Sequence, residues 1–261
     1  MIFLKLGGSL ITDKSRRETP RLTVLQRLAD EIGEALQVRP DLTLLVGHGS
    51  GSFGHPAAEL SGIQHGVKTQ EEWSGFLDTW AAANRLHRIV LDSLREAQLR
   101  VLSFPPSAMA VADDGAIVSF PDEPIRAALR AGLLPLTQGD IAFDRTRGAS
   151  ILSTERVMAF LAGRLKPTRI LLAGEEEGVY ERYPERNRVL PEISPGDLAS
   201  VQLRGSEAPD VTGGMADKVQ SAIQLTQAIP GVEVRIFSGS IPGNVQAALL
   251  GYALGTRVRG E

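Results

Sequence analysis

Three glycine-rich loops in this chain each carry a lysine or a histidine. They are Lys5–Ser9 with Lys14 just beyond it, Gly47–His55, and Asp210–Lys218. Glycine lets the backbone approach an anion closely, and loop amides at the start of a helix present partial positive charge to it. Three such loops predict a site that handles more than one phosphoryl group.

The first loop supplies two ammonium groups. Lys5 stands inside an apolar strand beside Gly7 and Gly8, and Lys14 is expected to return over the same crevice at the carboxyl end of that strand. Phosphoryl transfer needs donor and acceptor in line and the charge on the transferring oxygens neutralised, which lysines and loop amides can do. For Lys14 alone, a solvated surface charge is the alternative.

The second loop contains Gly49–Gly54, a formal match to the dinucleotide fingerprint, so a nicotinamide-dependent dehydrogenase stays open. That fingerprint expects a carboxylate at the end of the next strand, but Val101–Phe104 runs into two prolines. His55 precedes Pro56, which suits the first turn of a helix, and its ring is expected to donate to an anion there. His48 is expected to hold the turn by a backbone hydrogen bond.

The third loop opens a helix with Gly213 and Gly214, and Lys218 lies one turn into it, which suits the β- and γ-phosphates of a nucleotide. An ordinary helix capped by Thr212 is the alternative. Gly139–Asp140 follows another apolar strand and is expected to shape the acceptor side. The P-loop, HExxH and protein-kinase signatures are absent from the sequence, so nucleotide binding must use another design.

Composition narrows the class of protein. The 261 residues suffice for one large α/β domain or two joined lobes. The 28 basic and 31 acidic residues give a net charge of −3, which argues against a nucleic-acid partner. The absence of cysteine excludes disulfides, thiolate metal sites and cysteine nucleophiles. No segment reads as a signal peptide or a membrane span, so we expect a soluble, unprocessed protein.

Short apolar runs alternate with segments of helical periodicity, which predicts a mainly parallel sheet covered on both faces. The predicted strands are Ile2–Leu6, Leu42–Val46, Val101–Phe104, Leu133–Leu136, Ile170–Ala173 and Val232–Phe237. The predicted helices are Leu22–Leu36, Glu71–Leu94, Ile125–Ala131, Thr154–Leu161, Ala216–Thr226 and Val245–Leu250. We also expect a β-hairpin at Met109–Phe120, a long surface connection at Asn187–Glu207 and a lobe boundary near Lys166.

Four segments, in their order along the chain, resemble the motifs of the amino acid kinase superfamily, and most closely its isopentenyl phosphate kinase branch. They are Lys5–Lys14, His48–His55, Gly139–Asp144 and Asp210–Met215. The resemblance covers nearly the whole chain and implies an open αβα sandwich. It also implies an N-terminal lobe, residues 1–166, for the phosphate acceptor, a C-terminal lobe, residues 167–261, for ATP, one continuous sheet, and a cytoplasmic homodimer.

The reaction implied by this resemblance is transfer of a phosphoryl group from ATP to isopentenyl phosphate, and to dimethylallyl phosphate as a second acceptor. Its product, isopentenyl diphosphate, would feed isoprenoid biosynthesis by a mevalonate pathway. By the same implication, Lys5, Lys14 and Lys218 stabilise the transferring group and His55 binds the acceptor's phosphate. Mg²⁺ is expected on the nucleotide phosphates and water, so no protein metal ligand is predicted.

The remaining expected contacts divide between the two substrates. The expected acceptor-binding residues are Gly8, Ser9, Gly49, Ser50, Gly51, Gly54, His55, Phe76, Trp80, Gly139 and Asp140. The expected ATP-binding residues are Lys5, Gly7, Gly8, Ser9, Glu175, Gly178, Val179, Tyr180, Gly213, Gly214, Met215 and Lys218. Phe76 and Trp80 are included because an isoprenoid needs an apolar slot and they lie at helical spacing with Leu77 and Ala83; core packing is the alternative.

Two segments depart from the family pattern. Ser153–Arg156 stands where Ser-Gly-Asp-Asp is usual, and Glu175–Tyr180 stands where Asp-Val-Asp-Gly-Val-Tyr is usual. Glu155 and Glu175 keep a carboxylate on a longer side chain, and the acidic residue in the first segment normally orients the lysines. Two further interpretations therefore stay open: a kinase for another small phosphate or phosphonate such as fosfomycin, and a weakly catalytic nucleotide-binding regulator.

Overall fold

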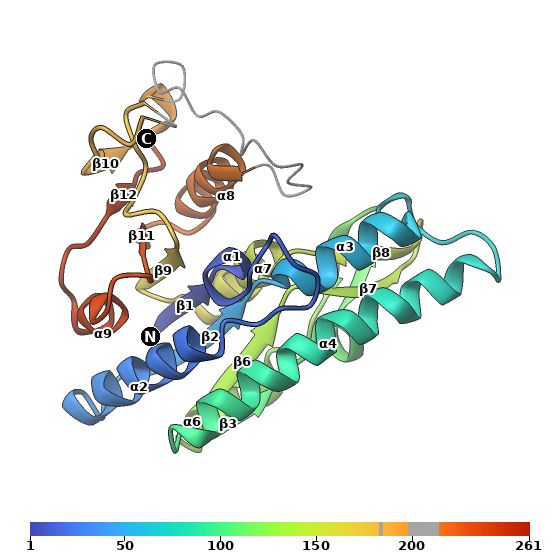
Figure 1. Ribbon diagram of the computed structural model, residues 1–261, viewed down its shortest axis with the longest axis horizontal. Coiled ribbons are helices and arrows are strands. Elements are labelled where there is room, and N and C mark those ends of the chain that lie inside the picture. Colours follow the sequence, from blue (N-terminus) through green and yellow to red (C-terminus); the bar gives the residue numbers. More distant parts are fainter. Residues whose placement is uncertain (183–184, 198–213) are drawn as a thin grey trace.

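The computed structural model describes residues 1–182, 185–197 and 214–261. Its centre is an eight-stranded sheet with strand order β10-β12-β11-β9-β1-β2-β6-β3. Each neighbouring pair is parallel except β11 with β12. Helices cover both faces of this sheet (Figure 1), which confirms the predicted α/β sandwich.

All six predicted strands are present, with small shifts at their ends. They are β1 (Ile2–Leu6), β2 (Leu44–His48), β3 (Val101–Ser103), β6 (Leu134–Gln138), β9 (Arg169–Gly174) and β11 (Glu233–Ser238). Two short strands, β10 (Glu192–Ile193) and β12 (Thr256–Val258), complete the sheet. Because β1 pairs with both β2 and β9, Lys5 lies beside Gly47 on one strand and Leu172 on the other, in the middle of the sheet.

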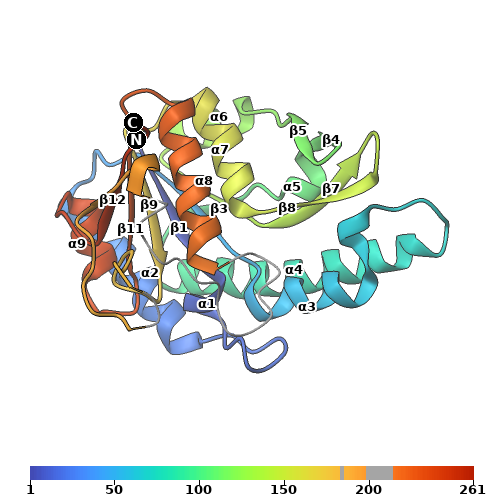
Figure 2. The same ribbon diagram turned by 90° about the horizontal axis from the view of Figure 1, so that it is seen from above.

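Successive residues of β1 point to opposite faces, so Phe3 and Leu4 belong to different hydrophobic clusters. The cluster around Leu4 is covered by α2 (Leu22–Val38), α4 (Glu72–Glu96) and α9 (Asn244–Leu250). The cluster around Phe3 is covered by α6 (Glu123–Arg130), α7 (Thr154–Leu165) and α8 (Gly214–Ala228). Figure 2 shows these two sets of helices on opposite sides of the sheet. None of the helices in the described ranges combines the length and the apolar composition needed to cross a bilayer.

A second sheet of four strands, in the order β5-β4-β7-β8, is built from two hairpins. The predicted hairpin consists of β4 (Val111–Asp113) and β5 (Ala116–Ser119), and its two turn residues, Asp114 and Gly115, have φ of 47° and 81°. Positive φ at both positions is what a tight two-residue hairpin turn requires. The other hairpin, β7 (Asp140–Asp144) with β8 (Gly148–Leu152), was not expected from the sequence.

Short helices connect the strands: α1 (Gly8–Ile11), α3 (Gly51–Ser61), α5 (Pro106–Met109), and the single turns η1 (Ile63–His65) and η2 (Pro195–Asp197). The expectation that a helix starts at His55 was wrong, because α3 already starts at Gly51. Of the predicted connection Asn187–Glu207, the described part contains β10 and η2, and the rest lies outside the described residues. Lys166 ends α7 in the left-handed conformation, with φ of 50°.

Candidate active site

A cavity of about 520 Å³ lies where β1, β2 and β6 end and their loops meet. Its lining brings together most of the site residues expected from the sequence. These are Lys5, Gly7, Gly8, Ser9, Lys14, Gly49, Ser50, Gly54, His55, Gly139, Asp140 and Lys218. Three lysines and one histidine from segments more than two hundred residues apart in sequence thus line the same space.

Other expected ligands do not line this cavity. Among the described residues these are Gly51, Phe76, Trp80, Glu175, Gly178, Val179, Tyr180 and Met215. Gly213 and the preceding part of the third loop lie outside the described residues. The cavity therefore contains most of the expected acceptor side, together with five residues of the expected nucleotide side: Lys5, Gly7, Gly8, Ser9 and Lys218.

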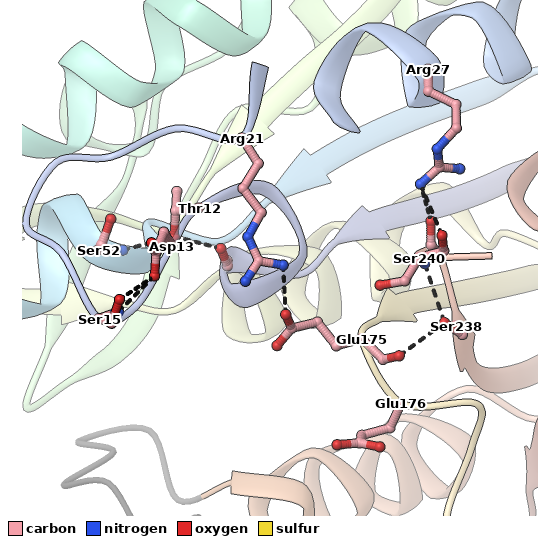
Figure 3. Close-up of polar contacts among 12 residues, drawn as sticks. Thr12, Asp13, Ser15, Arg21, Arg27, Ser52, Glu175, Glu176, Ser238 and Ser240 are labelled. Carbon is pink, nitrogen blue, oxygen red and sulfur yellow. Dashed lines mark hydrogen bonds and ion pairs between the residues drawn. The ribbon is translucent and has the colours of Figure 1, made fainter. Parts of the chain in front are cut away.

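The first two glycine loops pack backbone against backbone. A Cβ on Gly8 would lie 2.6 Å from the amide nitrogen of Gly51, and a Cβ on Gly49 would lie 2.8 Å from the amide nitrogen of Gly8. No side chain fits at either place. The Thr12 hydroxyl ties the loops together, because it donates to the Gly8 carbonyl (2.7 Å) and accepts from the Ser52 amide (2.9 Å) (Figure 3).

The carbonyl of His48 joins the second loop to the opposite wall. It accepts from the Thr154 hydroxyl at 2.7 Å and from the Gly139 amide at 3.0 Å. The His48 ring bonds the Gly49 carbonyl at 3.1 Å, as the sequence predicted. These contacts fix the three segments that line the cavity relative to one another.

Lys5 forms an ion pair with Glu155, which is in the first turn of α7. Burial acts to raise the pKa of Glu155, but the attraction of Lys5, and to a smaller degree of Lys218, holds it below its ordinary value. The carboxylate is therefore ionised between two of the cavity's ammonium groups. Glu155 stands where the family pattern has an aspartate, and its longer side chain still reaches Lys5.

His55 lies in the second turn of α3, followed directly by Pro56. Because proline has no N–H, the carbonyl four residues earlier, that of Ser52, loses its helical donor. The Glu18 amide donates to this carbonyl instead, at 3.0 Å, and the Thr19 amide donates to the Ser52 hydroxyl at 3.3 Å. The loop that carries Lys14 is thereby attached to the helix that carries His55.

Asp140 lines the cavity although it is only 4% exposed. Burial raises its pKa, and hydrogen bonds from the amides of Ser107 and Ile141 oppose that rise. Its two oxygens are thus occupied by backbone donors, and its position fits the expected role of shaping the acceptor side.

The wall toward α4 is formed by small and polar side chains, namely Ala58, Gln64, Thr79 and Ala83, with Ile151 from β8. Phe76 is buried instead in an aromatic cluster, stacked on Phe143 with 5.3 Å between ring centroids. Trp80 is 42% exposed and Leu77 is 58% exposed on the surface of α4. Of the four residues expected to form an apolar slot, only Ala83 faces the cavity.

The Glu175–Tyr180 segment follows β9, outside the cavity. The Glu175 side chain pairs with Arg21 at 2.6 Å, and its carbonyl accepts from the Ser238 hydroxyl at 2.9 Å (Figure 3). The Val179 amide donates to the Thr256 hydroxyl at 2.8 Å. These contacts anchor the segment to α2, β11 and β12.

Sequence reasoning did not single out several cavity residues as ligands. They are Gln64, Thr79, Arg147, Arg156, Asp217, Gln220, Ser221 and Gln224. Most follow no motif, and they reach the cavity only because the hairpins, α4 and α8 surround it. No group of three or more potential metal ligands occurs in the ranges that the structure describes.

Comparison with known proteins gives a consistent result. Residues 1–238 match the model of the amino acid kinase family. The isopentenyl phosphate kinase of Methanothermobacter thermautotrophicus is 36% identical over 274 aligned positions, covering 100% of both chains, and that of Haloferax volcanii is 32% identical over 100% of this chain and 99% of its own. A solved isopentenyl phosphate kinase structure superposes with a TM-score of 0.84 at 32% identity and covers 99% of each chain.

Proposed function

This chain belongs to the amino acid kinase family, and from that premise we propose that it phosphorylates isopentenyl phosphate with ATP and releases isopentenyl diphosphate and ADP. The observation that carries this proposal is the meeting of Lys5, Lys14, His55 and Lys218 in one cavity. The full-length relatives named isopentenyl phosphate kinase support the choice of acceptor. The chain is an enzyme, a phosphotransferase.

In this reaction an oxygen of the acceptor's phosphate attacks the γ-phosphorus of ATP, and the bond to the β–γ bridging oxygen breaks. The attacking oxygen is already anionic at neutral pH, so no general base is needed. Lys5 and Lys218 neutralise the charge on the transferring group, and the Glu155 carboxylate, which attracts both, orients their ammonium groups. His55 and the amides of Gly8 and Gly49 bind the acceptor's phosphate.

Lys14 completes the cation set on the acceptor side, since its loop is attached to α3 through Ser52. Mg²⁺ supplies further neutralisation of the nucleotide phosphates when it is bound with ATP. The donor set fits this arrangement: the cavity offers lysines and amides for phosphate oxygens, and its carboxylates Asp140 and Glu155 are engaged with protein donors.

The finer expectations rest on the resemblance and are proposed with it. Residues 1–166 bind the acceptor and residues 167–261 bind ATP. Dimethylallyl phosphate is a second acceptor, and the enzyme acts in the cytoplasm as a homodimer. The Phe76 and Trp80 contacts are replaced in this proposal by Ala58, Thr79, Ala83 and Ile151, which line the cavity.

The test is ADP release by the purified protein with Mg-ATP and, in parallel, isopentenyl phosphate, dimethylallyl phosphate, fosfomycin, acetylglutamate or UMP. We expect selective turnover of the isoprenoid monophosphates, with the diphosphate product identified by ³¹P NMR. Selective turnover of fosfomycin would replace the acceptor with a phosphonate. ATP binding without ADP release on any acceptor would replace the kinase with a nucleotide-binding regulator.

A further inference from the structure

Two arginines that no motif assigned to the site converge on the tip of the β4–β5 hairpin. A Cβ placed on Gly115 would lie 3.6 Å from Cζ of Arg147 and 3.8 Å from Nη1 of Arg156. Both guanidinium groups are therefore close to one point. Both residues are exposed and both line the cavity, so this point lies at the cavity's mouth.

The two positive charges are not equally compensated. Arg147 pairs with Asp114 at 2.7 Å. Within the described ranges, the guanidinium of Arg156 donates only to a neutral group, the Gly115 carbonyl, at 3.4 Å. Asp114 compensates Arg147, whereas Arg156 has no carboxylate partner in the described ranges, and the family pattern would place a carboxylate where Arg156 stands.

A buried carboxylate builds this arrangement. Asp144, which is 5% exposed, accepts from the Gly115 amide at 2.7 Å and from the Arg147 amide at 2.8 Å, so it joins the tips of both hairpins. Burial acts to raise the pKa of Asp144, but the Ser150 hydroxyl and these amides hold it well below its ordinary value. The carboxylate stays ionised, and Arg147 stays beside Gly115.

The position of Arg147 favours the acceptor over the nucleotide. The carbonyl of Arg147 accepts from the Val67 amide at 2.7 Å, just after η1, which places this hairpin tip on the side of the cavity lined by Gln64. The expected nucleotide side is formed by Lys218 on α8, which is a different segment of the cavity lining. An anion that approaches the Gln64 side meets the arginines at the mouth.

We propose, on the basis of the function proposed above, that Arg147 and Arg156 form an arginine clasp that captures the phosphate monoester of the acceptor at the cavity mouth before it reaches His55 and the lysines. Guanidinium groups suit this task because their donors match the oxygens of a phosphate. Charges at a cavity mouth raise the rate of association of an oppositely charged ligand, and salt weakens the effect.

The experiment measures steady-state kinetics of the full chain with Mg-ATP and varied isopentenyl phosphate, at about 20 mM and about 300 mM added salt. We expect Arg147→Ala and Arg156→Ala each to lower kcat/KM for isopentenyl phosphate by roughly fivefold at low salt and by much less at high salt. The turnover number kcat and the KM for ATP should change by less than about twofold. Arg156→Lys keeps the charge but loses the fork, so its kcat/KM for isopentenyl phosphate should lie between those of the wild type and Arg156→Ala.

Arg88→Ala is the matched control, because Arg88 is an exposed arginine on α4 that pairs with Asp92 and does not line the cavity. A kcat/KM for isopentenyl phosphate that is unchanged in the Arg147→Ala, Arg156→Ala double variant would overturn the clasp. A rise in the KM for ATP instead would assign the arginines to the nucleotide, which also overturns it.

Calorimetric binding of isopentenyl phosphate without nucleotide separates this inference from the proposed function. If the wild-type chain fails to turn over isopentenyl phosphate, the proposed function fails. The clasp is then still tested by whether the double variant weakens binding of isopentenyl phosphate, and of inorganic phosphate as a second probe; equal affinities for wild type and variant would overturn it.

Discussion

His48 Nε2 lies 2.9 Å from His87 Nδ1, and both rings are buried. The hydrogen bond of the His48 ring to the Gly49 carbonyl makes its Nδ1 the donor, so Nε2 must accept from His87. His87 Nε2 then accepts from the Ser103 hydroxyl at 2.6 Å. In this series of hydrogen bonds every donor points from Ser103 toward the second glycine loop, and that direction requires both imidazoles to be neutral.

This series of hydrogen bonds predicts that the stability of the folded protein decreases in acid. Burial, with the neighbouring His87, lowers the pKa of His48 to about 3, and burial lowers the pKa of His87 to about 4. Between the ordinary histidine pKa and these values the unfolded chain binds protons that the folded chain does not. The free energy of unfolding should therefore fall as the pH drops from about 6.5 to about 4, by roughly 1 kcal/mol per pH unit for each histidine.

Chemical denaturation at pH 7, 6, 5 and 4 measures this slope. A His87→Gln variant, which keeps polar atoms but does not titrate, is the comparison, and its slope should be smaller than that of the wild type. Equal slopes in both proteins would show that His87 is already protonated in the folded state.

His55→Ala should lower turnover of phosphate-bearing acceptors by roughly a hundredfold, because it removes a donor aimed at the acceptor's phosphate. The affinity for ATP, measured by calorimetry, should stay within about twofold. His65→Ala is the control, since His65 is an exposed histidine outside the cavity. Unchanged turnover in the His55→Ala variant would reduce this histidine to a packing residue of α3.

Glu155→Gln should damage both stability and turnover. Lys5 is only 8% exposed, so removal of its partner leaves a buried cation, with an expected cost of about 3 kcal/mol. Because the two lysines would also lose the carboxylate between them, kcat should fall by roughly tenfold or more. Glu155→Asp, with a shorter reach, should lie between wild type and Glu155→Gln in kcat. A Glu155→Gln enzyme with full kcat would mean that the lysines orient themselves.

Gly8→Ala should disable the site more than it unfolds the protein. The new methyl would meet the Gly51 amide nitrogen at 2.6 Å, so the two loops must separate, at an expected cost of about 2 kcal/mol. The KM for both substrates should rise, measured beside the melting temperature. Gly163→Ala is the control, because a Cβ there meets nothing within 4 Å. Wild-type kinetics in Gly8→Ala would refute close packing of the loops.

Much of the fold could be predicted because the central strands β1, β2 and β6 are fully buried. Val46 and Leu136 belong to continuous apolar runs, and such runs are typical of central parallel strands. The β7–β8 hairpin was missed because its first strand, β7, starts and ends with polar residues, Asp140 and Asp144, that are buried with hydrogen bonds to their carboxylates. Ser150, which bonds Asp144, lies in the same hairpin, but the Ser107 amide that bonds Asp140 comes from α5, so no local pattern indicates that contact.

The site residues that could be predicted are those in sequence motifs that directly follow a strand. The other residues that line the cavity could not be predicted. The search for an apolar slot favoured large side chains such as Phe76 and Trp80, whereas the α4 positions that line the cavity are the small ones, Thr79 and Ala83. The wall of a cavity must leave room for a ligand, so a large apolar side chain on a helix does not indicate that it lines the cavity. Arg147 gave no signal, and Arg156 was noticed only as part of the Ser153–Arg156 departure, because their meeting depends on how the β7–β8 turn and the start of α7 lie against the β4–β5 hairpin.

Pro56 has a consequence for motion. The Ser52 carbonyl that it leaves without a helical donor is occupied by the backbone of the lysine-bearing loop. An ordinary residue at position 56 would bring its own amide to compete for that carbonyl and would loosen the loop. With proline there, two hydrogen bonds join the segment that follows Lys14 to Ser52, so a displacement of the helix that bears His55 would be transmitted to the loop that bears the ammonium group.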